Sequence, residues 1–198
     1  MRFTQCLAVG AIALCSMAAQ AKIISLAFTK ISYGNSLSTL RGVDFSLVNG
    51  DGSDGGMPAI GYWSSEFIGL TNTTTGAYPS SSDLVFTFTE GTASDIRFSF
   101  DNWGSGNGSS YSLFDASGNL ISKNDISDVN GSWVDVVGGG VKSIVFDNGQ
   151  GNSGNSWEFA IGELDATITS SVPELPSTGL LLAGLAVVGA ALRRRQAM

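Results

Sequence analysis

Alternation of hydrophobic and polar residues through the middle of the chain limits its fold more than any other feature. The segments Leu84–Thr89, Ile96–Phe100 and Trp157–Ile161 each place every second side chain, all of them large and apolar, on one face. A period of two residues is that of a β-strand with one buried face, whereas an amphipathic helix repeats every 3.6 residues. No segment between residues 22 and 170 has a helical stripe. The pattern therefore predicts an all-β domain.

Turn residues divide this region into about ten short strands. Further candidates lie at residues 24–32, 43–48, 61–70, 111–114, 119–122, 133–137 and 142–146, and the final strand continues to residue 168. Asp115–Asn119 predicts a hairpin in which Gly118 takes a positive φ, and Gly138–Gly140 separates the next two strands. Many short strands with such turns predict an antiparallel β-sandwich, jelly-roll-like in topology. The last strand is similar, at the level of fold, to the closing strand of carbohydrate-binding modules.

The first 21 residues have the form of a secretory signal peptide. Arg2 precedes an apolar stretch from Cys6 to Met17, and Ala19 and Ala21 are the small residues that signal peptidase accepts before its cut. We expect a signal helix, cleavage after Ala21, and a mature domain over residues 22–170. Both cysteines leave with the signal, so the mature domain must be stable without disulfides.

The last 27 residues, 172–198, combine three features. Val172, Pro173, Glu174 and Pro176 form a short motif, residues 179–192 are uncharged, and Arg193, Arg194 and Arg195 follow. A helix over 179–192 would span roughly 21 Å, less than the ~30 Å hydrocarbon core. The arginines would stay on the cytoplasmic side and leave residues 22–171 outside. The segment is typical of a transmembrane helix that holds the protein in the inner membrane only until it is cut.

This tail resembles the PEP-CTERM sorting signal of Gram-negative bacteria, whose C-terminal region also occurs on proteins described as ice-binding. The chain departs from the usual Pro-Glu-Pro, because Leu175 stands between Glu174 and Pro176. The resemblance implies processing by an exosortase, release to the cell surface or the medium, and association with exopolysaccharide in a biofilm. It covers the tail and says nothing about residues 22–170.

A second sorting signal shares the same letters. Leu175–Gly179 reads L-P-x-T-G, the motif that Gram-positive sortases cut before the glycine. The short signal peptide and the lack of a Pro- or Thr-rich stalk favour the exosortase interpretation over a sortase-anchored surface protein. Both predict an exported protein.

Aromatic and acidic residues in loops are the candidate ligand-binding groups. Tyr62, Trp63 and Trp103 are predicted to stack on sugar rings, with Trp103 first because a Gly-rich loop surrounds it. Trp133 is a further candidate for stacking on sugar rings but, like Trp157, is assigned to the core. Loops rich in Asp, Asn and Gly suit a structural Ca²⁺, or are simply exposed turns. The predicted calcium ligands are Asp51, Asp54, Asp101 and Asp147.

The run Thr71–Thr75 raises an ice-binding alternative, since threonine arrays can order water. A flat ice-binding face needs such arrays on many strands, whereas this run is single and is followed by Gly76. We interpret it as a loop or an edge strand.

The residue inventory disfavours catalysis. The chain has no histidine and its mature part has no cysteine, which excludes Ser-His and Cys-His nucleophiles. Glu66 is the carboxylate nearest to an apolar setting, and no pair of acids is marked as a glycosidase pair. The mature region is strongly acidic, which excludes nucleic acid as a partner. We expect a non-catalytic cell-surface or extracellular-matrix protein, or alternatively a carbohydrate-binding module that uses the Trp103 loop.

Overall fold

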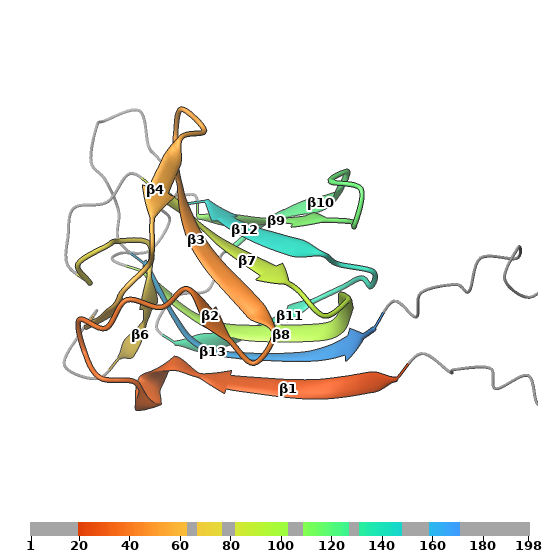
Figure 1. Cartoon of the computed structure of the whole chain (residues 1–198), viewed down its shortest axis with the longest axis horizontal. Helices are drawn as coiled ribbons and strands as arrows, with labels where there is room; N and C mark the ends of the chain where they lie inside the picture. Colours follow the sequence, from red (N-terminus) through yellow and green to blue (C-terminus); the bar gives the residue numbers. More distant parts are fainter. Residues whose placement is uncertain are drawn as a thin grey trace, which may run out of the picture. The chain divides into compact units, whose positions relative to one another are not determined.

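Antiparallel pairing arranges the strands in two sheets that pack face to face (Figure 1). The first, called the β13 sheet here, has the order β11 (Ser132–Val136), β8 (Thr92–Asn102), β13 (Phe159–Thr169), β6 (Ile68–Thr71) and β5 (Ile60–Tyr62). Strand β1 (Ala21–Ala27) also pairs with β13, beyond the part that β6 occupies. A 3-10 turn, η1 (Phe28–Lys30), follows β1.

The second sheet, called the β7 sheet, has the order β10 (Leu120–Asp125), β9 (Ser110–Phe114), β12 (Ser143–Asp147), β7 (Ser82–Phe88), β3 (Val43–Asn49) and β2 (Thr39–Leu40). Strand β4 (Asp54–Gly56) pairs with β3. The predicted all-β antiparallel sandwich is therefore confirmed.

The structure is a computed structural model that describes residues 20–62, 67–76, 82–102, 109–126, 131–147 and 159–170, with the backbone alone at Tyr62 and Asn102. All of these residues lie in one unit, Gln20–Ser171. Within these ranges no helix has the length and hydrophobicity needed to cross a membrane. The predicted hydrophobic helix over 179–192 lies outside them, as do residues 1–19 of the predicted signal peptide.

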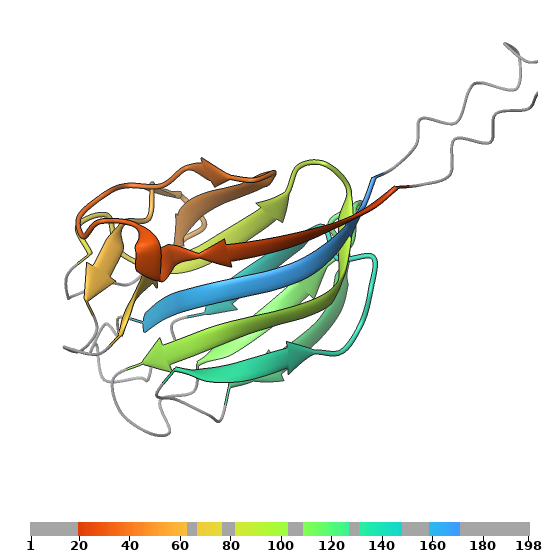
Figure 2. The ribbon, with the colours of Figure 1, turned by 90° about the horizontal axis from the view of Figure 1, so that it is seen from below.

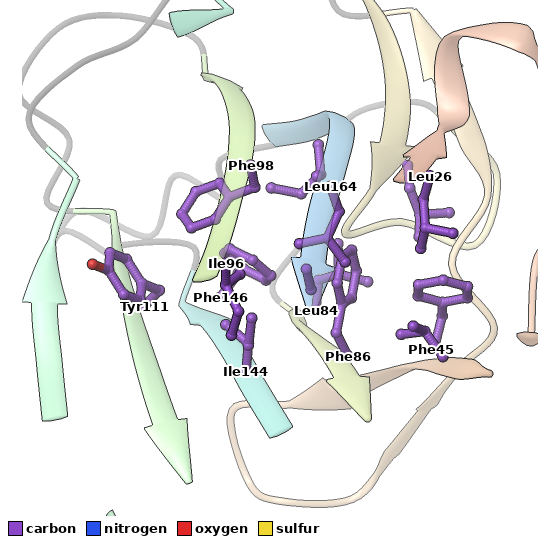
Figure 3. Close-up of a cluster of buried hydrophobic side chains, with 14 of the residues drawn as sticks. Leu26, Phe45, Leu84, Phe86, Ile96, Phe98, Tyr111, Ile144, Phe146 and Leu164 are labelled. Carbon is purple, nitrogen blue, oxygen red and sulfur yellow. The ribbon is translucent and has the colours of Figure 1, made fainter. Parts of the chain in front are cut away.

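The core lies between the two sheets and combines phenylalanine rings with isoleucine and leucine side chains (Figure 3). Phe86 is fully buried, and its ring centre lies 4.8 Å from that of Phe45 and 5.2 Å from that of Phe146. Phe98 closes the cluster from the β13 sheet, 4.9 Å from Phe146 in an edge-on arrangement. Such aromatic pairs contribute about 0.5–1.5 kcal/mol each beyond their burial. Every side chain of β7 and β8 predicted to face inward does so.

Two turns behave as predicted, and one predicted strand is wrong. Gly118 has a φ of 80° in the hairpin between β9 and β10, and Gly140 has a φ of 72° where the chain crosses from one sheet to the other. Residues 61–70, however, form two paired strands, with Ile60 opposite Leu70 and Gly61 opposite Gly69. Alternation cannot separate one long strand from a hairpin, because both put the same side chains on the inner face.

Candidate functional site

The outer face of the β13 sheet carries an exposed tryptophan. On β11, Val134 and Val136 pack toward the core, so the pleat turns Trp133 and Asp135 outward, and Trp133 is 43% exposed. Figure 2 shows this face, formed by β1, β13, β8 and β11, with no other labelled strand of Figure 1 across it. The assignment of Trp133 to the core is therefore wrong. Asp135, two residues further on, is the signal that could have placed Trp133 on the outer face.

Strand register sets charged groups beside this indole. In the backbone register, Asp135 lies opposite Arg97 on β8, and Arg97 lies opposite Asp165 on β13. The Nε and Nη2 atoms of Arg97 donate to the same oxygen of Asp165, at 2.9 and 2.8 Å. The guanidinium carbon lies 4.6 Å from the centre of the Trp133 ring. The guanidinium thus stacks over one face of the indole, and Trp133 as a whole remains 43% exposed.

The ion pair orients the tryptophan more than it stabilises the fold. The Arg97 side chain is 53% exposed and that of Asp165 is 21% exposed. Solvent screens such a pair, which contributes about 0.2–1 kcal/mol. A cation stacked on an exposed aromatic ring adds about 0.5–1 kcal/mol. Arg97 therefore makes weak contacts with both Asp165 and the indole, which together favour the stacked orientation of Trp133.

A second aromatic ring, Phe67, lies on the same face. A methyl group at Gly162 would stand 2.8 Å from Phe67 Cζ, and one at Gly131 would stand 3.0 Å from Phe67 Cε2. Both glycines therefore make room for this half-buried ring. The hydroxyl of Ser99 lies beneath it and accepts a hydrogen bond from the Glu163 amide at 2.9 Å. Ser99 is also the residue opposite Trp133, so the two aromatic side chains border one position of the sheet.

We refer to Phe67, Arg97, Trp133, Asp135 and Asp165 together as the Trp133 face. Its chemistry is that of a stacking platform: an immobilised aromatic surface with hydrogen-bonding groups at its margin. A sugar ring presents an apolar face of C–H groups to such an indole and its hydroxyls to the surrounding carboxylate and guanidinium. The face offers no nucleophile paired with a base.

The predicted stacking loops lie mostly outside the described residues. This applies to Trp63 and Trp103, and also to Glu66 and Trp157. Tyr62 ends β5, where only its backbone pairing with Ile68 is described. Their positions relative to the Trp133 face are therefore not described, and the Trp103 prediction stays a prediction.

The four predicted calcium ligands are not brought together. Asp51 accepts a hydrogen bond from the Ser53 amide at 2.9 Å, and Asp54 accepts one from the Gly56 amide at 2.8 Å, as in ordinary turns. Hydrogen bonds from Ser53 hold the pKa of Asp51 below its usual value. Asp147 pairs with Lys123 at 3.3 Å, and Asp101 is buried on β8. Across the described part of the chain, no three acidic, histidine or cysteine side chains are grouped to hold a metal.

The threonine run has a structural role. The Thr71 hydroxyl donates to the Ala59 carbonyl at 2.8 Å, and the Thr73 hydroxyl accepts from the Gly76 amide at 2.7 Å. Both of these threonines are buried, whereas Thr74 and Thr75 are exposed. Between Thr71 and Thr73, Asn72 is fully buried, accepts from the Phe159 amide and donates to the Ser82 carbonyl, each at 3.0 Å. The run joins the ends of β6, β7 and β13.

The predicted processing residues border the domain. Ala21 is the first residue of β1, whereas the others lie outside the described ranges: Ala19, Val172, Pro173, Glu174, Pro176, Arg193, Arg194 and Arg195.

No protein-family model matches the chain, and no curated protein matches it. Among solved structures, the chain is similar to a family 29 carbohydrate-binding module, CBM29-2, in a mutant form described as probing the mechanism of ligand recognition. The two chains are 16% identical with a TM-score of 0.41, over 79% of this chain and 99% of that chain.

Proposed function

We propose that residues 22–170 form a non-catalytic, carbohydrate-binding domain that acts outside the cell and binds polysaccharide on its Trp133 face. The observation that carries this proposal is the position of Trp133, which is 43% exposed on an open sheet face and stacked on Arg97. Large aromatic side chains are usually buried, and an exposed one held in a fixed orientation suits a ligand with a flat apolar surface. A jelly-roll-like sandwich is a suitable scaffold because its sheet faces are rigid.

The proposal keeps the carbohydrate-binding hypothesis but moves the predicted binding site from the Trp103 loop to the Trp133 face. Trp133 lies on β11, where pairing with Ser99 of β8 fixes its backbone position. Rigid elements lower the entropy that binding must overcome. The sheet face is therefore the better-supported site.

Binding of purified mature protein to insoluble polysaccharides tests the proposal. We expect Trp133→Ala to abolish retention, while Trp103→Ala retains it. Leu120→Ala is the matched control, because Leu120 is an exposed apolar residue, 58% accessible, in the other sheet. All three proteins should unfold at similar temperatures. Retention by Trp133→Ala, with loss in Trp103→Ala, would return the site to the loop.

We also propose that the domain is exported by its signal peptide and sorted by the PEP-CTERM-like tail, with an exosortase-type enzyme and transient inner-membrane anchoring. The support for this proposal is the sequence pattern of residues 1–21 and 172–198. Within the domain, Ala21 lies opposite Thr169. The chain therefore enters and leaves the folded domain at neighbouring strand ends. An association with extracellular polysaccharide then follows from both the tail resemblance and the Trp133 face.

A further inference from the structure

We infer that the polysaccharide bound at the Trp133 face carries free amino groups, as in a glucosamine-type polymer, and that the face discriminates against uronic acids. This inference rests on the proposed function and specifies its ligand. The inference follows from the charged groups of the Trp133 face: its arginine forms an ion pair, whereas two carboxylates on the same side of the sheet form none.

The one cation of the Trp133 face is already neutralised. Both of the Arg97 nitrogens that contact Asp165 donate to a single carboxylate oxygen, at 2.8–2.9 Å. Four other described cations have partners elsewhere. Lys22 contacts Glu90, and Arg41 donates to the Ser25 carbonyl. Lys123 contacts Asp147, and Lys142 donates to the Phe88 and Gly91 carbonyls. Among the described cations only Lys30, at the end of η1, has no described partner, and it is not part of the Trp133 face. An anionic sugar would therefore find no unpaired cation on that face.

Two carboxylates on the outer face of the β13 sheet, Asp135 and Glu163, form no ion pair within the described part of the chain. Asp135 follows Trp133 by two residues and shares its face of the sheet. Glu163 precedes Asp165 by two residues on β13 and shares the same face from the other side of β8. Negative charge thus lies on both sides of β8, at Asp135 on β11 and at Glu163 on β13.

Ammonium groups complement this arrangement, and carboxylates oppose it. A protonated 2-amino group on a stacked sugar can donate charge-assisted hydrogen bonds to Asp135 or Glu163, which are stronger than bonds from a hydroxyl. A uronate would add a third negative charge, and the acidic domain would also repel an anionic polymer at longer range. An acetylated amino sugar keeps the stacking contact but loses the charge.

The experiment compares soluble oligomers of β-1,4-linked glucosamine, β-1,4-linked N-acetylglucosamine and α-1,4-linked galacturonate by titration calorimetry. A mildly acidic pH keeps the amines charged while Asp and Glu stay ionised. The test variant is the double substitution Asp135→Asn/Glu163→Gln. The control is Asp44→Asn/Asp125→Asn, which removes two exposed charges from the outer face of the β7 sheet.

We expect wild-type protein to bind the glucosamine oligomer most tightly and the galacturonate least. The test variant should bind glucosamine about threefold to tenfold more weakly, as for exposed charge pairs, and N-acetylglucosamine unchanged. The control variant should behave as wild type. Equal losses in both variants, or equal wild-type affinities for the two amino sugars, would overturn the inference. Binding that is insensitive to Trp133→Ala would instead overturn the proposed function.

Discussion

Ala21 and Thr169 lie opposite each other at the start of β1 and the end of β13. Lys22, the next residue of β1, pairs through its Nζ with Glu90 at 2.7 Å. The predicted signal peptide ends at Ala21, and the predicted sorting tail begins at Val172. Pairing of β1 with β13 therefore places the first and last strands of the domain side by side.

The termini of the native protein should record both cuts. We expect mass spectrometry of protein from the envelope and medium of its host to find a chain that begins at Lys22. Its C-terminus should lie near Pro173–Pro176 and lack Arg193–Arg195. A C-terminus at Thr178 would indicate a sortase, and an intact Met198 would indicate a permanent anchor.

Arg97 should affect ligand binding more than stability. In Arg97→Ala the indole loses the group stacked on it, and we expect polysaccharide retention to fall about threefold to tenfold, in line with a contact of this kind. The unfolding free energy should change by less than about 1 kcal/mol, since the ion pair is partly exposed. Retention assays and urea unfolding measure the two effects. Wild-type retention in this variant would show that Trp133 needs no positioning partner.

Gly162 should be intolerant of any side chain. In Gly162→Ala the added methyl meets Phe67 and Ser99 at 2.8 Å, and we expect a loss of about 1–3 kcal/mol of stability. Gly139→Ala is the matched control, because its nearest neighbour, Ser94 Cβ, stands at an ordinary 3.5 Å. The further substitution Phe67→Ala should partly restore Gly162→Ala, which a double-mutant cycle by urea unfolding measures.

Asn72 should be one of the least replaceable polar residues. Asn72→Ala leaves the Phe159 amide and the Ser82 carbonyl without their side-chain partner in a buried region, at a cost of about 1–3 kcal/mol. Asn124→Ala, which removes an exposed hydrogen bond to the Ser122 hydroxyl, should change the unfolding free energy little. Similar unfolding free energies for the two variants would contradict this structural role.

The β9–β10 hairpin should weaken in acid. Hydrogen bonds from Asn119, and from the Ser117 and Gly118 amides, hold the pKa of Asp115 below its usual value. A carboxyl whose pKa is lower in the folded state stabilises the protein above its unfolded pKa of about 3.9, and that stabilisation is lost as pH falls through the folded pKa. Asp115→Asn should therefore melt at a lower temperature than wild type near neutral pH, and the difference should shrink in acid. A constant difference across the pH series would contradict this linkage.

Local sequence determined the class of fold because alternation and turn chemistry act over a few residues. The inward positions of β7 and β8, the positive φ of Gly118 and the break at Gly138–Gly140 could all be predicted in this way. The same locality limited the prediction at residues 61–70, where a hairpin and a long strand have one pattern.

Only the tertiary structure decided which side of β11 faces water. The alternation of Trp133 with Val134 defines two faces, and hydrophobicity alone favours burying the larger side chain. Pairing with β8 reversed that choice, because register places Trp133 opposite the outward Ser99 and Val136 opposite the inward Ile96. The partners Arg97 and Asp165 come from strands 68 residues apart in the chain. A site assembled by register between distant strands leaves no spacing in the sequence by which to find it.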